Sequence, residues 1–171
     1  IFEDCNYQSM LKTVVKSSFT NQGQICLCSS RILVEETIFE KFKTDFCNAI
    51  SELNIGDPKN DKTQFGSITS DEQFKKIKQY INLAKNENGN ILLGGKAIQL
   101  KGRCKNGWFI EPTVIEGLNN TSRLNQDEIF GPVVTLQSFK SEEEAIEIAN
   151  ESQYGLSATI WTKSHKKSSR V

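Results

Sequence analysis

The segment RILVEETIFEKFKTDFCNAISEL, residues 31–53, combines a strand pattern with a helix pattern. Its first six residues, 31–36, are rich in β-branched and other apolar side chains and predict a short strand. Thr37 and Glu40 then stand three positions apart, which is the pattern of a helix-capping box. The next apolar residues recur at helical spacing and form one stripe: Phe39, Phe42, Phe46, Ala49, Ile50 and Leu53. A strand that leads directly into an amphipathic helix is typical of an α/β fold.

The same alternation continues on both sides of this stretch. Asn6 can cap a helix that ends near Phe19, and Ser70–Gln73 and Ser141–Glu144 are two further capping boxes. Strands are expected at 1–2, 91–93, 108–110, 113–115, 133–139 and 157–162, and a loop at 96–107. The fold class is therefore α/β, with a mainly parallel sheet and helices on both faces. We expect six apolar helix residues to face the sheet: Phe42, Phe46, Ile77, Ile81, Ile146 and Ala149.

Composition excludes several classes of protein. The 171 residues carry 21 Lys and Arg against 21 Asp and Glu, so the formal net charge is zero. This balance gives no electrostatic reason to expect nucleic acid or an anionic membrane as a partner. No apolar run approaches the roughly 20 residues of a membrane helix. Five cysteines with a single His make a metal site improbable, and their odd number favours a reducing, cytoplasmic location.

One of these cysteines has the surroundings of a nucleophile. Cys26 ends the polar loop Thr20-Asn21-Gln22-Gly23-Gln24-Ile25, which follows a predicted helix. A catalytic thiol needs access and nearby donors for an oxyanion, and backbone amides of a glycine-containing loop can be such donors. The alternative is an inert cysteine, because a free Cys is often a small buried apolar side chain.

Four segments, in order along the chain, resemble the aldehyde dehydrogenase superfamily. FTNQGQIC at 19–26, followed by Ser30-Arg31, closely resembles the family's cysteine signature. WFIEPTV at 108–114, DEIFGPV at 127–133 and YGLSA at 154–158 are similar to three later family segments. The resemblance covers essentially all 171 residues, and the Cys26-Leu27-Cys28 pair looks most like the 2-aminomuconic semialdehyde dehydrogenase subfamily.

The resemblance implies an activity and a set of site residues. It implies NAD-dependent oxidation of an aldehyde, with NADP as the alternative cofactor, and a homo-oligomer when the protein is complete. Cys26 would be the nucleophile and its backbone N–H an oxyanion donor. Glu128 would bind the nicotinamide ribose, Phe130 would pack beside the nicotinamide, and Gln73 and Lys76 would lie near the same ribose.

The resemblance also implies missing parts. The family's general base, its asparagine oxyanion donor and its dinucleotide-binding domain have no counterpart in residues 1–171. We therefore expect a nucleophile-bearing part of the catalytic domain, truncated at both ends and inactive alone. Two other hypotheses stay open: a non-catalytic family member, and a cysteine hydrolase that uses His165. His165 follows Cys26 at the roughly 130–150 residue spacing of papain-like enzymes, but the residues that flank Cys26 lack their signature.

Overall fold

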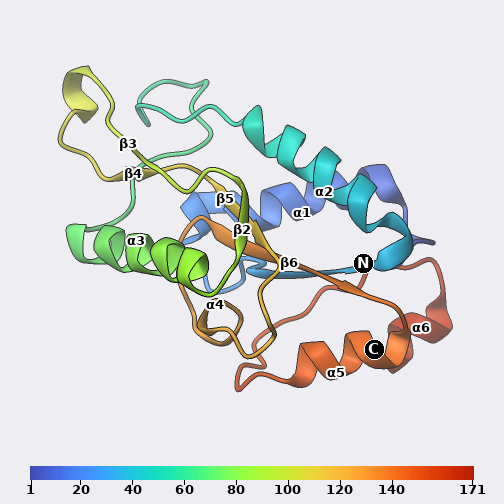
Figure 1. Ribbon diagram of the computed structural model, residues 1–171. Coiled ribbons are helices and arrows are strands. Elements are labelled where there is room, and N and C mark those ends of the chain that lie inside the picture. The colour runs from blue at the N-terminus through green and yellow to red at the C-terminus, as the bar shows by residue number, and fades with distance from the viewer.

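A four-stranded sheet forms the centre of the protein in the computed structural model, which describes all 171 residues (Figure 1). The strand order is β1 (Arg31–Glu35), β6 (Val133–Phe139), β5 (Thr113–Glu116) and β2 (Asn90–Leu93). The first three strands are parallel, and β2 pairs with β5 in the antiparallel sense. A separate two-stranded sheet joins β3 (Ala97–Ile98) to β4 (Phe109–Ile110). The mainly parallel sheet expected from the sequence is thus confirmed.

Helices cover both faces of the sheet. The helices α1 (Tyr7–Phe19) and α2 (Glu36–Ser51) pack on one face. On the other face lie α3 (Asp71–Asn86), α4 (Arg123–Gln126) and α5 (Glu142–Asn150). The remaining helical segments are η1 (Thr20–Gly23), η2 (Gly102–Cys104) and α6 (His165–Arg170). Figure 1 shows α1 above and α5 below the long strand β6.

The strands send alternate side chains to the two helical layers, because successive residues of a strand point to opposite faces. On one side, Ile32, Val34, Val114, Val134 and Leu136 join a core with Phe42 and Phe46. On the other side, Ile115 and Val133 pack with Ile77 and Ile81 of α3, and Phe139 packs with Ala145 of α5. Phe42, Phe46, Ile77 and Ile81 are therefore buried as predicted.

Helix α5 turns a different face to the sheet from the one predicted. Ala145 is its buried residue, Ile148 packs against the same cluster, Ile146 is half-buried and Ala149 is exposed. Ala145 and Ile148 lie three positions apart and share one side of the helix. The prediction for Ala149 is wrong, because four small or apolar residues in a nine-residue helix fit two overlapping stripes.

Three of the four predicted helix starts are confirmed. The side chains of Asn6, Ser70 and Ser141 accept hydrogen bonds from the first-turn N–H groups of α1, α3 and α5. The Thr37–Glu40 capping box is wrong, since α2 begins at Glu36 directly after β1 and has no side-chain cap.

Two other segments differ from the sequence-based expectation. Residues 157–162 form no strand, and the one backbone hydrogen bond recorded for them runs from the Phe2 N–H to the Trp161 carbonyl. Their apolar side chains pack on the core instead: Ile160 joins the cluster of Phe139 and Ala145, and Trp161 joins the cluster of Phe42 and Phe46. Residues 96–107, expected to be loop, contain β3 and η2.

The N-terminal segment lies beside β1 without being a regular strand. The Ile1 ammonium group donates to the Leu33 carbonyl at 2.8 Å, and the Glu35 N–H donates to the Ile1 carbonyl at 2.9 Å. This is the hydrogen-bond pattern of a parallel strand pair.

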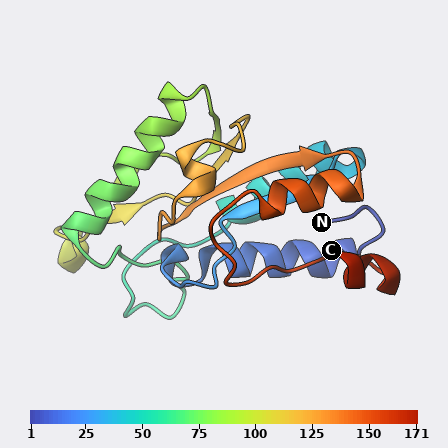
Figure 2. The same ribbon diagram turned by 90° about the horizontal axis from the view of Figure 1, so that it is seen from below.

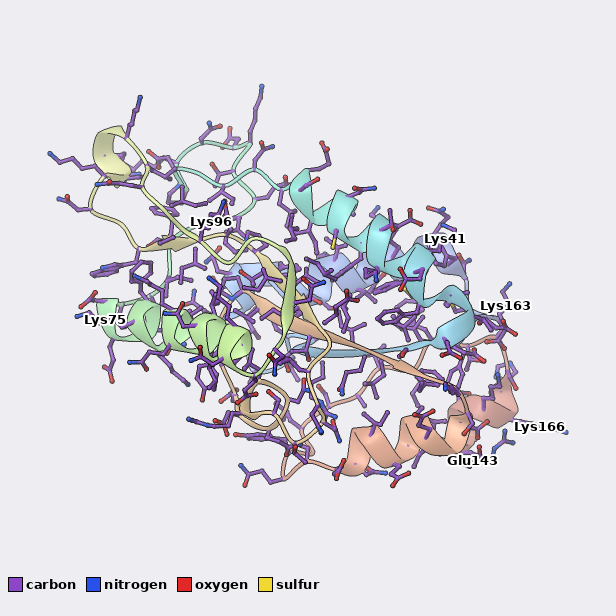
Figure 3. The ribbon with its side chains drawn as sticks, in the orientation of Figure 1. Lys41, Lys75, Lys96, Glu143, Lys163 and Lys166 are labelled. Carbon is purple, nitrogen blue, oxygen red and sulfur yellow. The ribbon has the colours of Figure 1, made fainter.

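Charged side chains lie on the outside of the molecule, as Lys41, Lys75 and Lys166 show in Figure 3. None of the helices has both the length and the apolar character needed to cross a membrane.

Candidate active site

The Cys26 loop follows α1 through a sharp change of backbone direction. Asn21, Gln22 and Gly23 have φ values of 50°, 59° and 68°, all in the left-handed region. This conformation costs a non-glycine residue about 1–2 kcal/mol. Gly23 is required for a second reason, because a Cβ there would lie 2.2 Å from the Gly131 carbonyl oxygen. The loop is thus pressed directly against the backbone of a second loop.

Cys26 lies in a tight turn at the surface. The Cys28 N–H donates to the Ile25 carbonyl at 2.9 Å and closes this turn. The Cys26 side chain is exposed, and its backbone N–H makes no hydrogen bond within the chain. An accessible thiol beside an unused N–H donor is the local arrangement that an oxyanion-forming nucleophile needs.

The second loop carries Glu128 and Phe130 between α4 and β6. Phe130 is half-buried and has φ 57°, so this loop also bends through the left-handed region. The Glu128 side chain is exposed, and its carboxylate has no hydrogen-bond or ion-pair partner. Its two oxygens are therefore free to accept hydrogen bonds from a ligand.

Gln73 and Lys76 reach this loop from the first turns of α3. The Gln73 side-chain amide donates to the carbonyls of Ile129 and Phe130, both at 2.8 Å. Lys76 Nζ donates to the Glu128 carbonyl at 2.9 Å. The structure therefore brings both predicted residues to the Glu128 loop, where their polar ends bind its main chain.

Two cavities lie where the Cys26 and Glu128 loops meet. The smaller one, of about 60 Å³, is lined by Cys26, Cys28, Glu128 and Phe130 among others. The larger one, of about 380 Å³, is also lined by Cys26 and Glu128, and it extends between β1 and residues 152–161. Its volume falls in the range of small-molecule sites. Cys26, the candidate nucleophile, and Glu128, the candidate ribose-binding residue, thus line the same two cavities.

The other four cysteines are all less exposed than Cys26. Burial raises the pKa of Cys28, whose Sγ lies 3.5 Å from the Thr20 carbonyl oxygen. Burial also raises the pKa of Cys5 and of Cys47. A higher pKa lowers the thiolate fraction, and the thiolate is the nucleophilic form.

His165 is not close to Cys26. It begins α6, which packs beside the N-terminal residues through Lys167 over the Phe2 ring. Cys26 follows the opposite end of α1, a helix of 13 residues that spans about 20 Å at 1.5 Å per residue (Figure 2). A general base must come within hydrogen-bond reach of its thiol, so the structure gives the cysteine-hydrolase hypothesis no base.

Sequence reasoning missed the residues that hold the Glu128 loop from its other side. The Tyr154 hydroxyl accepts a hydrogen bond from the Glu128 N–H at 3.3 Å. The Tyr80 hydroxyl at 2.8 Å, together with Arg123, holds the pKa of the neighbouring Asp127 carboxyl below its usual value. Tyr154 stands in the YGLSA segment already noted, but its partner lies 26 positions away and only the fold pairs them.

Comparison with known proteins gives a consistent picture. The aldehyde dehydrogenase family matches residues 1–171. A 2-aminomuconic 6-semialdehyde dehydrogenase from Pseudomonas sp is 39% identical over 171 residues, which cover 100% of this chain and 35% of that protein. A 2-aminomuconic semialdehyde dehydrogenase from Danio rerio is 41% identical over 165 residues, or 95% of this chain and 34% of that protein. The 2-aminomuconic subfamily that the sequence around Cys26 resembles is thus among the similar relatives.

A solved structure agrees with these relatives. The crystal structure of betaine aldehyde dehydrogenase from Staphylococcus aureus in complex with NAD+ has a TM-score of 0.94 and 35% identity. The match covers 99% of this chain and 33% of that one. This chain spans about a third of the length of the relatives that it matches. Sequence, fold and site geometry agree on one conclusion: the chain belongs to the aldehyde dehydrogenase family.

Proposed function

We propose that this chain supplies the nucleophile and part of the cofactor site for NAD-dependent oxidation of an aldehyde to a carboxylic acid. The observation that carries the proposal is the shared lining of both cavities by Cys26 and Glu128. Residues 1–171 are then a nucleophile-bearing part of the catalytic domain. Five free cysteines support a reducing compartment, for which we propose the cytoplasm, and we propose a homo-oligomer for the complete protein.

In this mechanism the Cys26 thiolate attacks the aldehyde carbon. A C–S bond forms, the carbonyl π electrons move to oxygen, and a thiohemiacetal oxyanion results. The Cys26 N–H, which has no partner within the chain, would donate a hydrogen bond to that oxygen. Loss of a hydride from the thiohemiacetal carbon would give a thioester. Water would then add to the thioester carbon and release the acid together with the free thiol.

The residues of the Glu128 loop fit a nicotinamide ribose. A free carboxylate can accept hydrogen bonds from both ribose hydroxyls, and the Glu128 carboxylate has no other partner. Phe130 offers an aromatic surface beside it, and Gln73 and Lys76 complete this part of the site from α3. Bound NAD+ would supply the hydride acceptor that converts the thiohemiacetal to the thioester. The Staphylococcus relative is a complex with NAD+, which supports this choice of cofactor.

We expect iodoacetamide to label Cys26 faster than Cys47 in the intact protein. Cys26 is exposed, whereas Cys47 is half-buried and burial raises its pKa. Peptide mapping by mass spectrometry at several reaction times measures both rates in one sample. Labelling of Cys47 ahead of Cys26 would contradict the assignment of Cys26 as the accessible nucleophile.

We also expect this chain alone to oxidise no aldehyde. Hydride transfer needs a cofactor held in line with the thiohemiacetal, and such positioning contributes about 7–11 kcal/mol. The chain's one glycine pair, Gly94-Gly95, follows β2 and leads to β3, so it does not form a phosphate-binding strand–turn–helix. Lack of a general base for thioester hydrolysis costs a further factor of about 10²–10⁴.

Absorbance of NADH, with the purified chain and a panel of aldehydes, tests this expectation, and the intact protein is the positive control. Turnover by the chain above the no-protein blank, absent from a Cys26→Ala version, would overturn it. An intact protein without activity toward any aldehyde of the panel would count against the proposed function itself.

A further inference from the structure

We propose that Gln24 is a positioning residue for Cys26, and that Gln22 assists it. The proposal rests on the function proposed above for Cys26. Gln24 is 9% exposed and stands two residues before the candidate nucleophile. A polar side chain buried this deeply must use its hydrogen-bonding groups, and Gln24 uses both ends of its amide. It touches neither of the two cavities at the site.

The two ends of the Gln24 amide join two different segments. Its Nε2 donates to the Asn21 carbonyl at 3.3 Å, across the left-handed turn that precedes it. Its Oε1 accepts from the Thr69 N–H at 2.9 Å, 45 positions away. The Asn21 side chain closes the same turn from the other side, since its Nδ2 donates to the Gln24 carbonyl at 3.2 Å. The Gln24 main-chain N–H also donates to the Asn21 carbonyl, at 3.0 Å. The Gln24 side-chain amide therefore adds a bond across the strained turn and anchors the turn to a distant segment.

Gln22 makes a parallel connection a few residues earlier. Its Oε1 accepts from the Gly66 N–H at 2.7 Å, and its Nε2 donates to the Ser67 carbonyl at 3.4 Å. Two glutamines of the Cys26 loop thus bind the main chain of residues 66–69. A glutamine suits this task because its amide carries an acceptor and two donors on one planar group.

Residues 66–69, which Gln22 and Gln24 bind, lead directly into the helix that holds the Glu128 loop. Thr69 is followed by Ser70, which caps α3, and the first turn of α3 carries Gln73. Gln73 binds the Ile129 and Phe130 carbonyls. The Cys26 loop and the Glu128 loop are therefore both attached, through amide side chains, to the same stretch of residues 66–73. Loss of the Gln24 amide would remove one of the two glutamine attachments of the Cys26 loop to this common support, the one nearer to Cys26. Displacements of about 1 Å can cost 10²-fold in rate.

The experiment compares two substitutions of Gln24 in the intact protein. Gln24→Met keeps the length of the side chain and removes donors and acceptor together. Gln24→Glu keeps the oxygen that accepts from the Thr69 N–H. Its ionised carboxylate repels the Asn21 carbonyl oxygen, whereas its protonated carboxyl group can donate a hydrogen bond to that oxygen. The matched control is Gln64→Met, since Gln64 Oε1 also accepts a backbone N–H, from Asn54 at 3.2 Å, at an exposed place away from both cavities.

Two rates and one stability measurement are read for each variant. The first rate is alkylation of Cys26 by iodoacetamide between pH 5.5 and 8.5, followed by peptide mapping and divided by the wild-type rate at each pH. The second is kcat/KM for aldehyde oxidation. Thermal unfolding by circular dichroism identifies any variant that fails to fold. The alkylation rate needs no cofactor or turnover, so it tests Gln24 even if the protein oxidises no aldehyde.

We expect Gln24→Met to slow alkylation of Cys26 by about tenfold or more at every pH. We expect the same substitution to lower kcat/KM by about 10–100-fold. Gln64→Met should leave both rates within twofold of wild type. The relative alkylation rate of Gln24→Glu should rise toward wild type as the pH falls, because the protonated carboxyl group restores the bond to Asn21. A role confined to the stability of the fold would lower the unfolding temperature and leave the alkylation rate of the folded protein unchanged.

Three results would overturn the proposal. One is a Gln24→Met protein that is folded and alkylates Cys26 at the wild-type rate. Another is a relative rate for Gln24→Glu that does not change with pH. The third is a relative alkylation rate that depends on pH in Gln24→Glu while Gln24→Met alkylates at the wild-type rate. This result would show only that a nearby negative charge raises the pKa of the thiol.

Discussion

We expect Cys26→Ala to lower the rate of aldehyde oxidation by the intact protein by at least about 10³-fold. The covalent route requires a sulfur nucleophile at this position, and the alanine methyl group cannot form the thiohemiacetal. Cofactor binding should be unchanged, because Glu128 and Phe130 belong to a loop that α3 holds through Gln73 and Lys76, and the Cys26 side chain takes no part in these bonds. Steady-state NADH formation measures the first effect, and fluorescence titration with NADH measures the second.

The matched control is Cys28→Ala, which should keep most of the activity. Cys28 is half-buried beside the Thr20 carbonyl, and burial raises its pKa, so its thiol is a poor substitute nucleophile. Substantial turnover by the Cys26→Ala protein would refute the assignment of the nucleophile. Equal losses in the two variants would show that the turn, and not the Cys26 thiol, is what the activity needs.

We expect Gly23→Ala to destabilise the protein by about 2–5 kcal/mol and to reduce aldehyde oxidation severely. The left-handed φ of 68° costs a side chain about 1–2 kcal/mol. The added Cβ would also lie 2.2 Å from the Gly131 carbonyl oxygen, and overpacking of this kind adds about 1–3 kcal/mol. Since the obstacle is backbone, the Cys26 and Glu128 loops must move apart. Urea unfolding gives the free-energy change, and NADH formation gives the activity.

Gly102→Ala separates the two contributions. Gly102 has nearly the same φ, 64°, but a Cβ there would meet nothing within 4 Å. Its substitution should cost only the conformational part and leave activity intact. If Gly23→Ala and Gly102→Ala proved equally mild, the close approach of the two loops would not be a constraint on the site.

Local signals in the sequence were enough for most of the secondary structure. The caps at Asn6, Ser70 and Ser141 and the strand at 133–139 are confirmed residue by residue. Each cap depends on groups within about four residues of one another, so the chain nearby determines the outcome. The segment at 157–162 shows where this stops. Its apolar pattern suits a strand, but a strand also needs a neighbour with free main-chain groups along its length.

Residues 1–171 are enough to show the family resemblance, the alternation of strands and helices, and Cys26 and Glu128 as candidate site residues. Other features appear only in the folded molecule: α5 buries Ala145 rather than Ala149, His165 lies away from Cys26, and Gln73 binds the carbonyls of the Glu128 loop. The physical reason is the same in each case. A side chain's burial and its hydrogen-bond partner depend on groups that are far apart along the chain, and packing of the helices on the sheet is what brings those groups together.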